Sequence, residues 1–438
     1  MSSRIVKFLT MGMLVFGLSL ATAFADSQAR IVRLSSVEGN VQIDRATGQG
    51  FEKAFANLPV TQGVQLKTGS EGRAEVEFED GSTLRVTPNT VVLFPDLSRN
   101  GSGGTVSAVQ IQEGMAYVNF LGAKDSVLNL AFAREQVQVT KAAHLRVDVA
   151  DTDATIAVFK GDVSVTGESG TFTVGKKQTA TFNMADKDRY TVANNLEEDP
   201  YDAWDKSQSD YQHKYASNSY VSNSPYSYGT SDLNYYGSYM NVPGFGMLWQ
   251  PYFAGAGWSP YMDGTWMYYP GYGYQWVSGY PWGWMPYHYG NWVYVPTWGW
   301  GWQPGGSWAG FNNTGTLVSN PPSGFVPPRK PSAPGSTPVI VGRGGSFSSP
   351  GTGKKVVIPE GSAGFGIPRG SVGNMSRLSQ QASTKGHAST RLNTTPATTS
   401  WPTATSPSST RMATPSAPRT SSPRISTPHA PSGPHGPH

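Results

Sequence analysis

Residues 74–86 read Ala-Glu-Val-Glu-Phe-Glu-Asp-Gly-Ser-Thr-Leu-Arg-Val. Apolar and polar residues alternate on both sides of the Asp80-Gly81 pair. A period of two places one side of each run in a core and the other side outward, as in half-buried strands. Asp-Gly is a hairpin signal, because the turn needs a positive φ that Gly adopts without steric cost. The stretch therefore predicts two antiparallel strands joined by a tight turn.

The same alternation extends over residues 30–190. It recurs at 37–43, which read Val-Glu-Gly-Asn-Val-Gln-Ile, and at 163–165. Residues 100–104, Asn-Gly-Ser-Gly-Gly, mark a longer loop, and no helical period runs through the region. Repeated short strands without helices predict an all-β domain, either a sandwich, a barrel or a solenoid.

Several runs of this region resemble the FecR domain in the order of that family's motif. They are Val64-Gln-Leu-Lys-Thr-Gly69, Gly72-Arg-Ala-Glu-Val76, Asp80-Gly-Ser-Thr-Leu-Arg-Val86, Pro88-Asn-Thr90, Gln112-Glu-Gly-Met-Ala-Tyr-Val118, Val158-Phe-Lys-Gly-Asp-Val163 and Val174-Gly-Lys-Lys-Gln178. The resemblance implies a FecR-like β-rich domain. One departure is Thr140-Lys141 and Ala143-His-Leu-Arg146, where the family usually has Thr-Pro and then Gly-Thr. A second is that the regulators of this family carry a sigma-factor-binding segment and a membrane span before the domain, whereas a signal peptide stands here.

A second domain is expected at 199–312, where the sequence repeats itself. Eleven of the thirteen Trp residues lie between Trp249 and Trp308. Three copies of one pattern begin at Gly237, Gly264 and Gly290, with spacings of 27 and 26 residues. Each copy has a strand of aromatic residues, a Pro and Gly turn and a second strand, so we expect three hairpins packed on one another. The repeat resembles an aromatic domain of unknown function that often follows FecR-like domains, and a short helix is expected in the upstream 199–204 segment.

The aromatic rings have two interpretations at this point. Trp and Tyr supply large apolar areas and can form the core of a small repeat domain, and the same flat rings can stack on sugars as a ligand platform. The segments that connect the repeats are the best candidates for exposure. The candidate ligand-binding residues are Trp258, Tyr261, Trp284, Tyr287 and His288.

The N-terminus predicts export from the cytoplasm. Arg4 and Lys7 precede an apolar run from Phe8 to Leu20, and Ala23-Phe-Ala25 follows as a cleavage triplet. These are the three parts of a secretory signal peptide, assigned to residues 1–25 with cleavage near Ala25. The chain has no Cys, so it needs no disulfides in an oxidising compartment. A periplasmic or secreted protein is expected.

Residues 319–438 are rich in Pro, Ser, Thr and Gly, and they predict a disordered basic tail. The tail holds twelve Lys and Arg against one acid, Glu360, whereas residues 26–318 hold 19 basic and 28 acidic residues. An acidic body argues against nucleic acid as a partner, and the basic tail suits a peripheral contact with an anionic envelope surface.

No pattern of the chain indicates catalysis. The sequence has no Gly-x-Ser-x-Gly elbow in a strand-to-helix setting, no His-Glu-x-x-His and no phosphate-binding Gly loop. We expect no enzyme, no cofactor and no metal site. The sequence predicts an exported, non-catalytic envelope protein that binds or scaffolds, with a cell-wall glycan or an envelope protein as partner. Glycan recognition by the Trp-rich repeats and envelope signalling are the alternatives.

Overall fold

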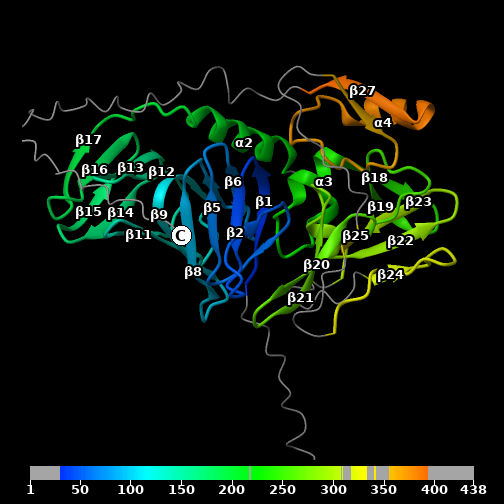
Figure 1. The fold of residues 1–438 in the computed structure, drawn as a ribbon, viewed down its shortest axis with the longest axis horizontal. Coiled ribbons are helices and arrows are strands. Elements are labelled where there is room, and N and C mark those ends of the chain that lie inside the picture. Colours follow the sequence, from blue (N-terminus) through cyan, green and yellow to red (C-terminus); the bar gives the residue numbers. More distant parts are fainter. Residues whose placement is uncertain are drawn as a thin grey trace, which may run out of the picture. The chain divides into compact units, whose positions relative to one another are not determined.

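The computed structural model describes residues 30–216, 219–306, 308, 317–332, 340–341 and 355–392 (Figure 1). All of these residues belong to one compact unit. The predicted signal peptide at 1–25 lies outside the described residues. Strands dominate the described chain, with α-helices only at α2 (Asp202–Tyr215), α3 (Thr230–Tyr236) and α4 (Met375–Lys385), so the all-β prediction is confirmed.

The first domain consists of two β-layers, between which the chain passes repeatedly. In the order of pairing, layer A contains β4 (Pro59–Val60), β1 (Val32–Glu38), β6 (Arg73–Glu77), β7 (Thr83–Val86), β9 (Thr105–Phe120), β12 (Ala143–Val149), β13 (Asp153–Lys160), β16 (Gln178–Asn183) and β17 (Arg189–Ala193). Layer B contains β3 (Glu52–Lys53), β2 (Val41–Asp44), β5 (Gln65–Thr68), β8 (Val91–Arg99), β9 again, β10 (Val127–Phe132), β11 (Glu135–Val139), β14 (Val163–Gly167) and β15 (Gly170–Val174). The predicted hairpin at 74–86 is the β6–β7 pair, in which Glu77 lies opposite Thr83.

Strand β9 belongs to both layers. Its first half pairs with β8 and β10, and its second half pairs with β7 and β12. Gly114 lies at the crossing with a φ of 78°, and a Cβ there would come within 2.4 Å of the Asn89 carbonyl oxygen. Only Gly fits this position, because both the backbone conformation and the space exclude a side chain.

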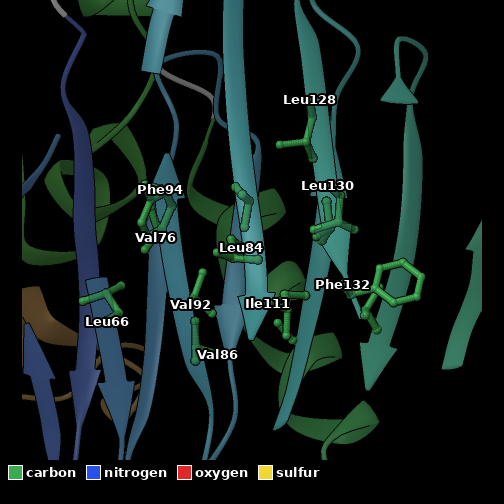
Figure 2. Close-up of a cluster of buried hydrophobic side chains, with 14 of the residues drawn as sticks. Leu66, Val76, Leu84, Val86, Val92, Phe94, Ile111, Leu128, Leu130 and Phe132 are labelled. Atoms are coloured by element: carbon green, nitrogen blue, oxygen red, sulfur yellow. The ribbon is translucent and has the colours of Figure 1, made fainter. Parts of the chain in front are cut away.

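The core lies between the two layers. Figure 2 shows aliphatic and Phe side chains from both of them, among them Val76 and Leu84 from layer A and Leu66 and Leu130 from layer B. These four side chains are at most 1% exposed. The alternation in the sequence places them inward, since successive residues of a strand point to opposite faces.

The predicted aromatic hairpins are present. They are β18 (Gly237–Val242) with β19 (Gly246–Pro251), β20 (Gly264–Tyr269) with β21 (Gly273–Ser278), and β22 (Asn291–Val295) with β23 (Gly299–Gln303). Equivalent aromatic pairs face each other across them: Tyr239 and Trp249, Trp266 and Trp276, Trp292 and Trp302. The first and third hairpins share a sheet with β24 (Leu317–Ser319), and the second pairs with β25 (Ile340–Val341). Short 3-10 turns lie at Ser219–Val221 and Met285–Tyr287.

Part of the predicted disordered tail is folded, and for this part the prediction is wrong. Residues 355–392 form β26 (Lys355–Pro359), helix α4 and β27 (His387–Arg391). Asn374 caps α4 by accepting from the Arg377 backbone N–H, and Gly386 ends it at a φ of 74°. Apolar side chains of this segment, such as Ile358 and Leu392, pack into the aromatic cluster of the second domain. They bury enough surface against a preformed partner to offset the entropy of ordering.

Candidate functional site

The five candidate ligand-binding residues are buried. Trp258 is 4% exposed, Tyr261 6%, Trp284 0%, Tyr287 1% and His288 3%. The prediction that the connectors expose their rings is therefore wrong. The connectors fold back over the hairpins, and their rings fill the spaces between the aromatic pairs of the repeats. These five rings therefore offer no open face on which a sugar could stack.

Three of these residues form side-chain hydrogen bonds within the protein. The Trp258 indole N–H donates to the Tyr280 hydroxyl over 2.9 Å. The Tyr287 hydroxyl donates to the Pro260 carbonyl, and the His288 Nδ1 lies 2.8 Å from the Trp284 carbonyl oxygen. Burial lowers the pKa of His288 to about 4, so the ring is neutral at pH 7. The five residues thus belong to the buried aromatic core, in which the polar groups of Trp258, Tyr287 and His288 have partners within the protein.

A group of charges that the sequence analysis did not single out lies on the outer side of layer A. We call it the charged face and define it by Arg33, Glu75, Glu77, Arg85, Asp205, Asp232 and Arg369. The strand residues among them alternate with core residues, so they point away from the core. Glu75 lies directly opposite Arg85 across β6 and β7, and Arg33 lies opposite Glu77 across β1 and β6. Although outward, each of these four residues is at most 5% exposed, because other parts of the chain cover them.

Helix α2 covers one part of the charged face (Figure 1). The Arg85 guanidinium donates to Glu75 over 2.8 Å and to Asp205 of the helix over 2.6 Å. It also donates to Ser209 and Gln212, one and two helical turns further along. The second Asp205 oxygen lies 2.9 Å from His144 Nε2. All the donors of one buried Arg are thus directed at a carboxylate of the sheet and at one side of α2.

Helix α3 and the segment before α4 cover the other part. Asp232 of α3 pairs with Arg33 over 2.6 Å and with Arg369 over 2.8 Å. Arg369 also pairs with Glu75 over 2.8 Å. Glu77 pairs with Arg33 over 3.2 Å and accepts from the Gly229 backbone N–H. The charged face therefore joins layer A to α2, to α3 and to a segment more than 130 residues beyond α3.

The electrostatics differ between the two glutamates. Burial by itself raises the pKa of Glu75, but Arg85 and Arg369 outweigh it and hold that pKa below its ordinary value. Burial raises the pKa of Glu77 to about 7, and repulsion from Asp232 and Glu75 adds to the effect. Burial also opposes the ionisation of Asp205, yet His144 and Arg85 lower its pKa. Glu75 and Asp205 are ionised and paired at neutral pH. Of these three carboxyl groups, Glu77 takes up a proton most readily.

Further contacts fix the second domain to the first. The Asn57 side-chain amide donates to the carbonyls of Ser278 and Tyr280, over 3.0 and 2.7 Å. Arg33 donates to the Pro281 carbonyl over 2.9 Å, and Arg99 donates to the Tyr226 hydroxyl over 2.7 Å. These bonds reach the β-layers of the first domain from the end of β21, from the connector after it and from the loop before α3.

The described residues contain no group of three or more His, Cys, Asp or Glu that could hold a metal ion. No helix in the described ranges has both the length and the hydrophobicity needed to cross a membrane. The members of the charged face pair with one another, and these pairs hold layer A, α2, α3 and the segment before α4 together. A signal for it was present in the sequence, because Arg and Glu occupy outward positions on adjacent predicted strands, but that pattern does not say what covers them.

Comparison with known proteins places two family matches on this fold. Residues 64–164 match the family described as FecR protein. Residues 230–319 match a family of unknown function, DUF6600. No curated protein matches the sequence.

Two crystal structures of a putative anti-sigma factor from Parabacteroides distasonis ATCC 8503 are similar to parts of the chain. The 1.65 Å structure shares 16% identity over 32% of this chain and 63% of its own, with a TM-score of 0.28. The 2.50 Å structure shares 15% identity over 41% of this chain and 94% of its own, also with a TM-score of 0.28. The chain thus spans less than two thirds of the length of the first of these structures.

The family matches agree with the resemblance found in the sequence motifs and with the position of the aromatic hairpins. Layers A and B carry the FecR match, and the hairpins β18 to β23 carry the other. The protein contains a FecR domain followed by a domain of the DUF6600 family.

Proposed function

We propose that the protein is an exported, non-catalytic component of a bacterial envelope that binds or scaffolds an envelope protein. The observation that carries the proposal is the charged face, which ties the FecR domain, the aromatic domain and the 355–392 segment into one unit. Buried ion pairs whose partners come from separate segments fix the relative position of those segments. A unit whose domains are fixed in this way is suited to present constant surfaces to a partner.

The state of the acids and bases supports a non-catalytic role. Glu75 and Asp205 are held by guanidinium groups, and His288 is neutral and buried. A cavity of about 10 Å³ lies beside Asp80 and Ser82, which is room for about one water molecule. General acid–base catalysis needs a titrating group within reach of a bound substrate, whereas Glu75 and Asp205 face guanidinium groups and His288 packs against Trp rings.

Export is proposed from the N-terminal pattern at 1–25. We would fuse residues 1–40 to alkaline phosphatase, which needs disulfides and is active only outside the reducing cytoplasm. The expected result is phosphatase activity, and the matched control is the fusion in which residues 8–20 are deleted. Equal activity from both fusions, or none from the first, would contradict export.

The scaffolding role is tested by isolating the full chain, tagged at its C-terminus, from gently cross-linked cell envelopes. We expect a discrete assembly of constant mass that contains an envelope protein in fixed ratio. The matched control is the Arg85→Ala variant, in which helix α2 loses its pairing and the assembly should be depleted. Recovery of the wild-type chain as a monomer in every fraction would refute the role.

Envelope signalling is a second candidate, because the FecR match covers the central strands of both layers. It predicts that deleting the gene changes transcription of a defined set of genes and that the full chain restores it. Scaffolding without signalling predicts loss of the assembly with unchanged transcription. Measuring both in the same deletion strain separates the two functions.

A further inference from the structure

The segment 364–372 contacts both domains without belonging to a helix or strand. Its Ile367 is 3% exposed, and the Ile367 carbonyl accepts a 2.7 Å hydrogen bond from the Tyr236 hydroxyl. The Val372 backbone N–H donates to the Tyr235 hydroxyl over 2.8 Å. Two neighbouring tyrosines of α3 thus hold the backbone of this segment on both sides of Arg369.

The Arg369 side chain enters a recess formed by three other elements. One of its nitrogens lies 2.8 Å from Glu75 of β6, and another lies 2.8 Å from Asp232 of α3. Its guanidinium carbon lies 5.5 Å from the centre of the Tyr211 ring of α2. Two carboxylates and an aromatic face make up a complete receptor for a guanidinium, because the planar group forms two directed hydrogen bonds and stacks on a ring.

The recess is acidic when Arg369 is left out. The carboxylates of Glu75, Glu77, Asp205 and Asp232 then face only the guanidinium groups of Arg33 and Arg85, together with His144. Asp232 keeps Arg33 and the Tyr211 hydroxyl as partners, but Glu75 loses one of its two guanidinium partners. A buried site with more carboxylates than cations favours a ligand that brings a positive charge.

We propose that this recess is a peptide-binding site for a short turn-forming segment with an aliphatic residue, Pro and Arg in succession, and that Ile367-Pro368-Arg369 occupies it as a ligand carried by the same chain. The inference does not rest on the proposed function, since it concerns only binding between parts of this protein. It assigns the guanidinium to Glu75 and Asp232, the ring contact to Tyr211 and the backbone contacts to Tyr235 and Tyr236. A ligand of this kind binds its site without needing the covalent connection.

The test uses the full chain with a protease recognition sequence inserted between Val341 and Lys355. After cleavage, the two fragments are separated by gel filtration at decreasing concentration, and the dissociation rate is measured. We expect the wild-type fragments to co-elute and Arg369→Ala to release the C-terminal fragment at least tenfold faster. The matched control is Arg377→Ala, which removes the same side chain from an exposed position of α4 in the same fragment.

Equal release rates for Arg369→Ala and Arg377→Ala would overturn the proposal, as would immediate separation of the wild-type fragments. If Arg369→Ala does not fold before cleavage, Arg369→Lys serves in its place. Lys keeps the charge but cannot form two fixed hydrogen bonds to separate carboxylates. Release faster than wild type supports a guanidinium site, and release at the wild-type rate contradicts it.

Discussion

The two β-layers of the FecR domain have outer surfaces of opposite character. The outer side of layer A carries Arg and Glu, and it is buried beneath α2, α3 and the Arg369 segment. At β11, β14 and β15 the outer side of layer B carries amides and hydroxyls, such as Gln136, Gln138, Thr166 and Thr171, and it is exposed. Charged residues are usually the most exposed in a protein, whereas here the charges of layer A are covered and the uncharged side chains of β11, β14 and β15 meet the solvent. The comparison teaches that charges of both signs, placed in register across strands, mark a surface that another part of the chain covers.

Breaking the charged face should have the largest effect. Arg85→Ala leaves Glu75 and Asp205 without their shared guanidinium in a buried setting, and we expect a loss of about 3–5 kcal/mol in the free energy of unfolding. Urea denaturation followed by circular dichroism measures it. Arg134→Ala, which removes an Arg whose side chain is 53% exposed, is the control and should cost less than about 1 kcal/mol. Similar losses for the two variants would show that the buried pairs do not stabilise layer A.

The junction of the two layers should be the next most sensitive position. Gly114→Ala combines an unfavourable positive φ with a clash at the Asn89 carbonyl, and a loss of about 2–3 kcal/mol is expected. Gly48→Ala has a similar φ of 81° but no atom within 4 Å, so it isolates the backbone contribution of about 1 kcal/mol. The difference between the two denaturation midpoints measures the clash. No difference between the two variants would mean that a Cβ at residue 114 fits beside the Asn89 carbonyl without a clash.

The pH dependence of stability tests the burial of Glu77 on the outer side of layer A. Glu77 has a folded pKa of about 7 against an ordinary value of 4.5, so the folded state binds its proton more tightly. Its contribution to stability is present in full below about pH 4.5 and is lost as the pH rises through 7, with a slope of at most about 1.4 kcal/mol per pH unit.

Glu77→Gln should remove that part of the slope and stabilise the protein at pH 8 relative to wild type. The charged groups around it, Arg33, Arg369, Asp232 and Glu75, stay in place. Denaturation midpoints between pH 5 and pH 8 measure the effect, and Glu113→Gln at an exposed position of β9 is the control. An unchanged slope in Glu77→Gln would show that Glu77 does not hold the proton.

The smallest effect is expected on layer B. Gln138→Lys places a charge on the exposed outer side of β11, where nothing in the described structure covers it. The free energy of unfolding should change by no more than about 0.5 kcal/mol. A loss of several kcal/mol would reveal that this face is also covered, and the contrast between the layers would then disappear.

Local pattern predicted a large part of this structure. The alternation around Asp80-Gly81 predicted the β6–β7 hairpin, and the repeats at Gly237, Gly264 and Gly290 predicted three hairpins at their observed places. Both features depend on neighbours within about 15 residues. The exposure of the connector rings was predicted incorrectly, because a Trp repeated for stacking and a Trp repeated for packing give the same pattern.

The charged face could not be predicted because its partners are distant in the sequence. Alternation correctly places Glu75 and Arg85 outside the core, but it contains no information about α2 or Arg369. The folded part of the tail was missed for a related reason. The composition of 319–438 hides a short strand in which Val356 and Ile358 point inward and pack against an aromatic surface, while Val357 between them is exposed.

The position of Arg369 in the chain has a consequence for biosynthesis. Glu75 and Arg369 are 294 residues apart. Synthesis proceeds at about 5–20 residues per second, so Glu75 emerges at least about 15 seconds before its second cation. During that interval the charged face of the incomplete chain lacks Arg369, the second guanidinium partner of Glu75. Truncated chains that end before residue 369 would keep Glu75 and Asp232 without this cation permanently.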